Sequence, residues 1–396
     1  MSAIIFDETA KYAGQNVLHA IIVGVSDYEF LPNPGAPAVP GGLGLQKLTA
    51  AARTATELAK WLKGRQGQLT LPIGTIRLCV ESTAADLAKP ETTPPAGASG
   101  ASRAEVATAL NEWRAAQGPD DMALFYFAGH GVQRSRSDMV LLCADFNAPN
   151  DGPLSRAIEL THIWDGLGRT PVSATIARQQ VYFVDACRER PSAFNNFETL
   201  TVPDVWGVPV LKAKDDRSAP IFYATTPGTL AYADEGIATL FSKTLLRCLE
   251  NEAATLNDDT GEWQITSASL ERALFSRFRA LAGTSTDQEC DSDHAMHDFL
   301  LSRLPMPPAC ALKLQIDPDA AVPVTAVNVL DLETQKNVAL PQPLAPHPHD
   351  FTLPGGYYKF SAAIQPPQAP YSDVQLKPRL IEPSRLVGAI RLKVGP

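Results

Sequence analysis

The sequence predicts an α/β fold, in which a mostly parallel sheet is sandwiched by helices, followed by a small C-terminal all-β sandwich domain. Between residues 18 and 304, short apolar runs rich in β-branched residues alternate with segments of helical spacing, a pattern typical of a parallel sheet. After Pro305 the helical spacing disappears, and short runs of alternating polarity are separated by Pro, Gly and Asp. Such runs are typical of an antiparallel sandwich.

Composition narrows the class of protein. The 396 residues carry a net charge of −9, which disfavours a partner with a phosphate backbone, so we expect no nucleic-acid binding. No apolar run approaches the ~18–20 residues of a membrane span, and the N-terminal segment lacks the basic and apolar regions of a signal peptide. We therefore expect a cytoplasmic protein that does not bind membranes. The six cysteines are widely spaced, so disulfides are not expected.

Three segments are expected along the chain. Residues 1–17 form an N-terminal extension, 18–304 form the α/β domain, and 305–396 form an accessory β-sandwich. The Pro-rich stretch 305–308 marks the second boundary because proline interrupts both helices and sheets.

The α/β domain is expected to begin with a strand at 19–25 that ends in a polar turn. Leu48, Leu58 and Leu62 share one face of a helix expected over 45–62. The next expected elements are a strand at 75–80, a flexible surface insertion at 88–101, and a helix that starts at Ser102 with a capping box.

The second half continues the alternation. Strands are expected at 121–128, 139–144, 180–184, 220–225 and 298–301, and helices at 158–167, 238–249 and 267–281. Residues 188–219 contain three prolines and are expected to be irregular. In the C-terminal domain, strands are expected at 311–316, 324–330, 351–353, 357–364 and 387–394.

Two polar turns carry the candidate chemistry. His130 lies between two glycines directly after one apolar strand, and Cys187 follows another. Function in open α/β sheets lies at the carboxyl ends of strands, where such turns meet. A histidine can lower the pKa of a thiol and later protonate a leaving amine. Taken alone, each residue is more often structural, but the two turns together favour a nucleophile and its base.

The two turns also carry a family resemblance. Tyr126-Phe127-Ala128-Gly129-His130-Gly131 and Val184-Asp185-Ala186-Cys187-Arg188 resemble the caspase-like cysteine peptidases, nearest to their metacaspase-like and bacterial caspase-like branch. The resemblance implies a caspase-like sheet sandwich over residues 18–304. It implies that His130 is the general acid/base and Cys187 the nucleophile of a cysteine endopeptidase. The backbone N–H groups of Gly131 and Cys187 would then form the oxyanion hole.

Acidic residues point to the substrate preference. Asp27 follows the first strand, Asp185 precedes the cysteine, and Asp234 lies on a later loop. Together they favour binding of Arg or Lys just before the cleaved bond, although Asp185 could equally cap a turn. Lys212, Lys214 and Arg217 match this preference within 188–219, so they are the candidate sites of self-cleavage.

Cofactors and partners are only partly indicated. The cluster at 291–298 has two histidines three positions apart, too few ligands to predict a metal site. Calcium is possible through the resemblance alone. The expected partners are protein substrates and an activating protein, in the setting of a zymogen-like effector protease of defence or cell death. The alternative is a catalytically silent caspase-like scaffold that recruits partners through its C-terminal β-domain.

Overall fold

The structure is a computed structural model that describes residues 3–135, 138–168, 175–196, 200–207, 215–229, 238–282, 288–294, 297–367, 370–385 and 389–395. Within these residues, no helix has both the length and the apolar character needed to cross a bilayer.

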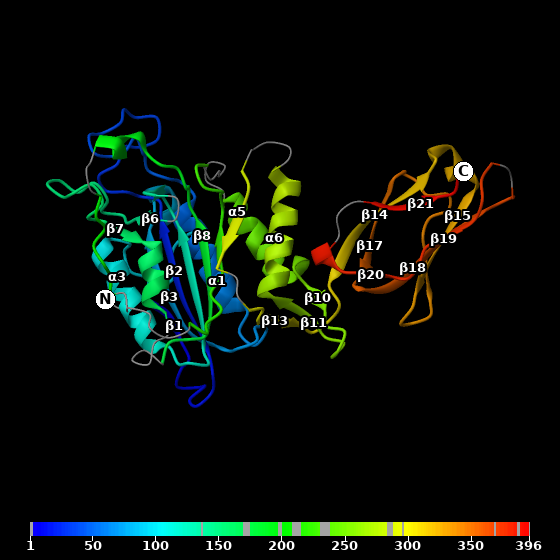
Figure 1. The fold of residues 1–396 in the computed structure, drawn as a ribbon, viewed down its shortest axis with the longest axis horizontal. Helices are drawn as coiled ribbons and strands as arrows, with labels where there is room; N and C mark the ends of the chain where they lie inside the picture. Colours follow the sequence, from blue (N-terminus) through cyan, green and yellow to red (C-terminus); the bar gives the residue numbers. More distant parts are fainter. Residues whose placement is uncertain are drawn as a thin grey trace. The chain divides into compact units, whose positions relative to one another are not determined.

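A seven-stranded sheet forms the centre of the first part of the chain (Figure 1), and it confirms the predicted fold class. Its order is β1 (Ile4–Asp7), β3 (Ile73–Glu81), β2 (Leu18–Val25), β4 (Met122–Ala128), β8 (Gln179–Asp185), β9 (Ile221–Tyr223) and β12 (Asp291–Asp293). The five inner strands are parallel to one another, and the two edge strands are antiparallel to their neighbours. The inner strands are almost completely buried, which explains their continuous apolar sequences.

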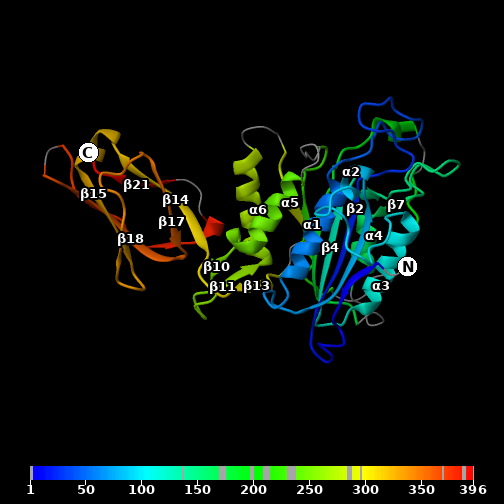
Figure 2. The same cartoon turned by 180° about the vertical axis from the view of Figure 1, so that it is seen from behind.

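Helices cover both faces of this sheet (Figure 2). One face receives α1 (Ala51–Gly64), which lies so close to β2 that a Cβ on Gly24 would come within 2.4 Å of the Ala55 side chain. The opposite face receives α3 (Arg103–Ala116), whose Trp113 donates a hydrogen bond from its indole to the His19 carbonyl. The capping box predicted at Ser102 is present at the start of α3.

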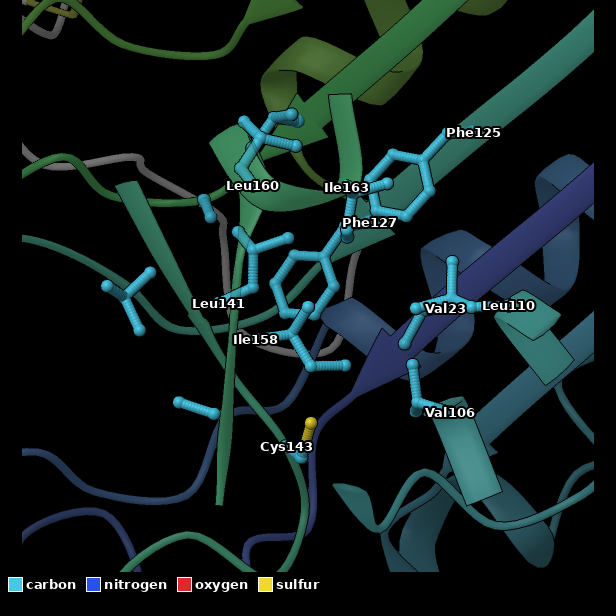
Figure 3. Packing of buried hydrophobic residues seen from close by; sticks show 14 of the residues in the cluster. Val23, Val106, Leu110, Phe125, Phe127, Leu141, Cys143, Ile158, Leu160 and Ile163 are labelled. Carbon is cyan, nitrogen blue, oxygen red and sulfur yellow. The ribbon is translucent and has the colours of Figure 1, made fainter. Parts of the chain in front are cut away.

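The core under α3 is continuous from the sheet to α4 (Leu160–Gly166), as Figure 3 shows. Phe125 and Phe127 of β4 pack against α3 residues such as Leu110 and against Ile163 of α4. A small sheet of β5 (Gly131–Gln133), β6 (Met139–Leu142) and β7 (Ala157–Glu159) contributes Leu141 and Ile158 to the same core.

One expectation for this part of the chain was wrong. Residues 45–50 are not helical, because the backbone N–H of Leu48 bonds to the Ser26 carbonyl and the loop is held beside β2. The Ser26 hydroxyl accepts from the Ala52 N–H, so the helix begins at Ala51 instead.

The insertion 88–101 has no helix or strand and lies largely at the surface, as expected. Its end is held to the sheet, since Ser99 exchanges backbone hydrogen bonds with Leu78 and Val80 along β3.

The remaining elements before residue 305 are short or lie outside the central sheet. They are α2 (Ala84–Leu87), a 3₁₀ turn at Ser192–Asn196, α5 (Leu240–Arg247), a π-helical turn at Cys248–Glu252 and α6 (Ser267–Ala282). A separate three-stranded sheet has the order β10 (Thr255–Leu256), β11 (Trp263–Thr266) and β13 (Leu300–Leu304). The strand expected at 298–301 is therefore displaced to 300–304 and pairs with β11 in this separate sheet.

The C-terminal residues form the expected small β domain, with two sheets around one apolar core. One sheet has the order β17 (His349–Pro354), β14 (Ala309–Asp317) and β21 (Ala389–Lys393). The other has the order β16 (Asn337–Val338), β15 (Thr325–Asp331), β18 (Gly356–Ile364) and β19 (Val374–Gln375), and β20 (Arg379–Ile381) also pairs with β18. The pairing of β14 with β21 is parallel, a departure from the antiparallel pattern expected.

The chain divides into two compact units, one of residues 1–246 and 277–299, the other of residues 247–276 and 300–396. The second unit thus includes the sheet of β10, β11 and β13 as well as the C-terminal sandwich. Its extent differs from the boundary expected between residues 304 and 305, because the β10–β11 hairpin contacts the sandwich: the Thr255 hydroxyl donates to Glu382 at 2.8 Å.

Candidate active site

Two neighbouring strands bring His130 and Cys187 to the same edge of the central sheet. β4 and β8 are parallel, and their register pairs Ala128 with Asp185. His130 lies two residues after Ala128, and Cys187 lies two residues after Asp185. Because the offset is the same on both strands, the two turns leave the sheet side by side.

Backbone contacts continue beyond the ends of these strands. The Gly129 N–H donates to the Asp185 carbonyl at 3.3 Å, and the Gln133 N–H donates to the Glu189 carbonyl at 2.8 Å. Between these bonds, a Cβ on Gly131 would lie 2.6 Å from the Cys187 carbonyl oxygen. Glycine at position 131 therefore permits the turn of His130 to lie directly against the loop of Cys187.

The His130 side chain is fixed by a backbone carbonyl. Its Nε2 lies 2.6 Å from the carbonyl oxygen of Gln46, in the loop between β2 and α1. A carbonyl only accepts hydrogen bonds, so Nε2 carries the proton and Nδ1 of the neutral ring is left as the basic nitrogen. The Gln46 side chain in turn bonds to the backbone of Gly35 and Ala36, which holds the loop in place.

Tyr28 orients the histidine from a second direction. Its phenol oxygen accepts the backbone N–H of His130 at 2.7 Å, and the two rings lie 4.9 Å apart. Burial raises the pKa of Tyr28, so the phenol stays protonated. Its hydroxyl also contacts the Leu142 carbonyl at 3.4 Å.

Burial also controls the charge of His130. The ring is almost completely buried, and the loss of hydration lowers its pKa to about 4, although the bond to Gln46 acts in the opposite direction. The imidazole is therefore neutral near pH 7. A neutral imidazole with an unprotonated Nδ1 can accept a proton from a thiol.

Cys187 differs from the other cysteines in its accessibility. It is half-buried, whereas the remaining five thiols are buried. Burial raises the pKa of Cys79 to about 11 and that of Cys290 to about 12, which makes these thiols poor nucleophiles at neutral pH. Of the six, only the thiol at position 187 combines access with a place beside the candidate base.

Arg188 anchors the loop that follows the nucleophile. Its guanidinium stacks 4.0 Å from the ring centre of Tyr223 and donates to the Asp291 carboxylate at 2.8 Å. Its backbone N–H and carbonyl bond to the backbone of Thr229 and Gly228. The loop is thus attached to β9, β12 and the segment after β9.

Asp185 is the last residue of β8 and precedes the nucleophile by two positions. Its carboxylate is 4% exposed, accepts a hydrogen bond from the Tyr126 hydroxyl at 2.9 Å and accepts another from Thr239. Burial raises the pKa of Asp185 to about 6, while the two hydroxyl donors lower it.

Asp27 lies in a different place. It lines a cavity of about 430 Å³ together with Glu29, Glu81, Lys47 and other residues, and it forms an ion pair with Lys47 at 2.6 Å. Asp185 does not line this cavity. The structure therefore places Asp27 in a cavity that Asp185 does not line, and Asp234 lies outside the described residues.

The structure describes only one of the three candidate sites of self-cleavage. Lys212 and Lys214 lie outside the described residues. Arg217, expected on an exposed loop, has a fully buried side chain that pairs with Asp215 at 2.7 Å and stacks on Trp164 at 3.7 Å. That expectation was wrong, because the planar guanidinium finds an aromatic face and a carboxylate inside the fold.

Calcium, expected through the resemblance alone, stays a prediction. Among them, no group of three or more His, Cys, Asp or Glu side chains is arranged to hold a metal ion. In the acidic cavity around Asp27, the ammonium group of Lys47 forms an ion pair with the Asp27 carboxylate.

Two residues of this site were missed by the sequence analysis. Gln46 acts through its backbone carbonyl, which leaves no signature in the type of side chain. Tyr28 was recognised only as part of the turn after the first strand. Its position three residues beyond the end of β2 was a signal, since polar residues at strand ends gather at the functional edge of such sheets.

Comparison with known proteins identifies the family of the chain. The model of the peptidase C14 family, described as the caspase domain, matches residues 18–265. An uncharacterized protein of Sinorhizobium fredii (strain NBRC 101917 / NGR234), y4kE, is 25% identical over 354 residues, which cover 86% of this chain and 91% of that protein.

Two solved structures are also similar. Protein GSU0716 from Geobacter sulfurreducens has a TM-score of 0.41 and 16% identity, covering 70% of this chain and 93% of that one. Caspase-1 from Spodoptera frugiperda has a TM-score of 0.41 and 13% identity, covering 74% of this chain and 94% of that one. Because the family model spans more than half of the residues, the chain belongs to the peptidase C14 family of caspase domains.

Proposed function

We propose that the protein is a cysteine endopeptidase in which Cys187 is the nucleophile and His130 the general acid/base. The observation that carries this proposal is the register of β4 and β8, which sets the two residues at equal offsets on adjacent parallel strands. The bond from His130 Nε2 to the Gln46 carbonyl adds a defined tautomer, in which Nδ1 serves as the base.

The reaction proceeds in two stages. The Cys187 sulfur attacks the scissile carbonyl carbon while Nδ1 of His130 takes the thiol proton. The oxyanion that forms accepts hydrogen bonds from the backbone N–H groups of Gly131 and Cys187. His130 then gives its proton to the leaving amine, the C–N bond breaks, and a thioester remains on Cys187. Water attacks the thioester with His130 again as base, which releases the acid and restores the thiol.

Asp185 is the residue that best supports a preference for Arg or Lys before the cleaved bond. It precedes the nucleophile by two residues and holds a carboxylate that a cation would stabilise in its charged form. Tyr126 and Thr239 both donate to Oδ2 of this carboxylate, so a substrate cation would contact Oδ1 while these two bonds are kept. Asp27 is less suited, because Lys47 already balances its charge.

A panel of fluorogenic peptides tests this proposal. We expect turnover after Arg or Lys, and a loss of at least about 10³-fold in kcat for both Cys187→Ala and His130→Ala. The matched control is Cys143→Ala, a buried cysteine of the same domain that should retain activity. Comparable turnover in Cys187→Ala would refute the nucleophile, and no turnover in the wild type with any peptide would favour the silent scaffold.

Self-processing is a separate part of the proposal. If the chain cleaves after Lys212 or Lys214, mass spectrometry of the incubated wild type should find new termini at residues 213 or 215, and Cys187→Ala should remain intact. Arg217 should not be a site, since its side chain is buried. An intact wild type that still hydrolyses peptides would reject self-processing but keep the endopeptidase.

A further inference from the structure

The second compact unit contains a cavity of about 770 Å³ that takes no part in the proposed catalysis. It is formed by the β10–β11 hairpin, the end of β13, the Pro-rich link after β13, and the turns that follow β15 and β17, whose strands are labelled in Figure 1. Its volume lies within the usual range of ligand sites. The residues that line it are Leu256, Gly261, Glu262, Trp263, Arg303, Leu304, Pro305, Met306, Pro307, Leu332, Glu333, Gly355, Gly356 and Tyr357.

Large apolar side chains are exposed at this cavity. Met306 is 71% exposed and Tyr357 is 41% exposed, and among the described residues only Leu87 joins them as an exposed large hydrophobic. Trp263 also lines the cavity, and a Cβ on Gly355 would lie 2.5 Å from its indole ring. Apolar side chains that are exposed together around a cavity indicate a binding surface, whereas apolar residues exposed singly are common on any protein.

The residue types favour a protein segment as the ligand. Trp263, Tyr357, Met306 and Arg303 are all of residue types that are enriched where proteins bind one another. Tryptophan, tyrosine and arginine supply most of the binding energy in such interfaces. Methionine adapts its shape to different apolar partners.

The charges around the cavity favour a basic segment. Arg303 forms an ion pair with Glu262 at 3.2 Å, so these two charges balance. Glu333 also lines the cavity, and Asp258 accepts a hydrogen bond from the Tyr357 hydroxyl at 3.1 Å. The lining therefore has one carboxylate more than it has cations, and Asp258 beside Tyr357 adds a second. They lie near an exposed aromatic ring, whose face also attracts cations.

We propose that this cavity docks a segment of a partner protein in which an apolar or aromatic side chain lies next to Lys or Arg. The apolar side chain contacts Trp263 and Met306. The cation faces Glu333 and the ring of Tyr357. The site is independent of peptide hydrolysis, since no residue of the candidate dyad takes part in it.

Fluorescence polarisation with the full chain carrying Cys187→Ala tests the proposal without hydrolysis of the probe. The probes are fluorescein-labelled heptapeptides with a central Phe flanked by Lys, and the same peptides with Glu in place of Lys. We expect saturable binding of the Lys peptide that weakens as salt is raised, and at least about tenfold weaker binding of the Glu peptide. No binding, or equal binding of both peptides, overturns the proposal.

Variants locate the binding and separate it from the catalytic cleft. Tyr357→Ala and Glu333→Lys should each weaken binding about tenfold with an unchanged Tm, because both side chains are at the surface. Leu87→Ala, the matched exposed hydrophobic of the other unit, should leave the affinity unchanged. Binding that survives Tyr357→Ala and Glu333→Lys but is lost in Asp185→Asn would assign the peptide to the cleft and overturn the docking site.

Discussion

At the scale of single residues, His130 is defined by its two hydrogen bonds more than by its own sequence context. One bond fixes the ring nitrogen at the Gln46 carbonyl, and the other fixes the backbone at the Tyr28 phenol. Both partners come from the segment after β2, which is why β2 matters to a site formed at the ends of β4 and β8. Two predictions belong to this scale.

The first prediction concerns Tyr28. Tyr28→Phe keeps the ring but leaves the buried N–H of His130 without its acceptor, so we expect a loss of about 1–3 kcal/mol in the free energy of unfolding. We also expect a lower kcat with little change in KM, because the imidazole is less well held. Urea denaturation and steady-state kinetics measure the two effects.

The control is Tyr358→Phe in the C-terminal domain, which removes a hydroxyl donor to the Pro354 carbonyl at 3.1 Å. It should lower stability and leave kcat unchanged. Equal effects of both variants on kcat would show that Tyr28 is not a positioning residue.

The second prediction concerns Asp185 and pH. Its pKa rises to about 6 in the folded state from an ordinary value of 3.8, so between these values the folded chain holds a proton that the unfolded chain has lost. Stability therefore falls as pH rises through this window. The free energy of unfolding of Asp185→Asn, minus that of the wild type, should therefore rise by on the order of 3 kcal/mol from pH 4 to pH 7.

His130 has the opposite effect on the wild type. Its pKa falls to about 4 from 6.5, so the unfolded chain holds the extra proton and stability rises with pH between these values. In the wild type, the fall in stability due to Asp185 and the rise due to His130 offset each other. In Asp185→Asn only the contribution of His130 remains, so the stability of this variant should rise with pH. Urea unfolding at several pH values measures this. The control is Asp350→Asn, which changes an exposed carboxylate; its free energy of unfolding should differ from that of the wild type by the same amount at every pH. A difference that is also constant for Asp185→Asn would contradict the prediction.

At the scale of elements, the loop after β8 is held by the edge of the sheet. Arg188 reaches the Asp291 carboxylate on β12 and the ring of Tyr223 on β9, so the nucleophile's loop is attached to two strands that follow it by many residues. Position 188 is therefore a structural link between the active loop and the sheet edge.

The third prediction follows from that link. Asp291→Asn leaves the buried guanidinium of Arg188 with only its aromatic and carbonyl contacts. We expect the free energy of unfolding to fall by about 1–3 kcal/mol, a limited loss because Asp291 itself is a third exposed. A double-mutant cycle with Arg188→Met should give a coupling energy above about 1 kcal/mol. The exposed pair Lys313–Asp350 should give less than that in the same assay, and equal couplings would argue against the link.

At the scale of the whole molecule, the division into units does not follow the composition of the sequence. The change in pattern at residue 305 marks where the sandwich strands begin, but the β10–β11 hairpin belongs to the same compact unit as the sandwich. Gly355 covers the Trp263 indole, and Glu382 accepts hydrogen bonds from Thr255 and Leu256.

The fourth prediction tests this division. A chain that ends after residue 305 lacks Gly355, which covers the Trp263 indole in the full chain. We therefore expect a lower Tm, red-shifted tryptophan emission and binding of an apolar dye. The red shift should be much smaller when the shortened chain also carries Trp263→Phe. An unchanged Tm and emission would mean that residues 1–305 are complete without the sandwich.

The sequence determined the alternation of strands and helices, the capped start of α3 and the two turns that carry His130 and Cys187. These features are local: apolar runs specify buried strands, and a serine with a glutamate three residues later specifies a cap. The β strands of the C-terminal domain followed from the same kind of pattern.

Tertiary structure decided the rest, because it depends on groups that are distant in sequence or that act through the backbone. The loop at 45–50 stays non-helical through a bond to Ser26, and Gln46 then offers a carbonyl to a histidine 84 positions away. Arg217 has a charged side chain that would be expected at the surface, but it is buried because it pairs with the Asp215 carboxylate and stacks on the Trp164 indole inside the fold. Local patterns report which residues avoid water, but only the folded chain shows which partners they find there.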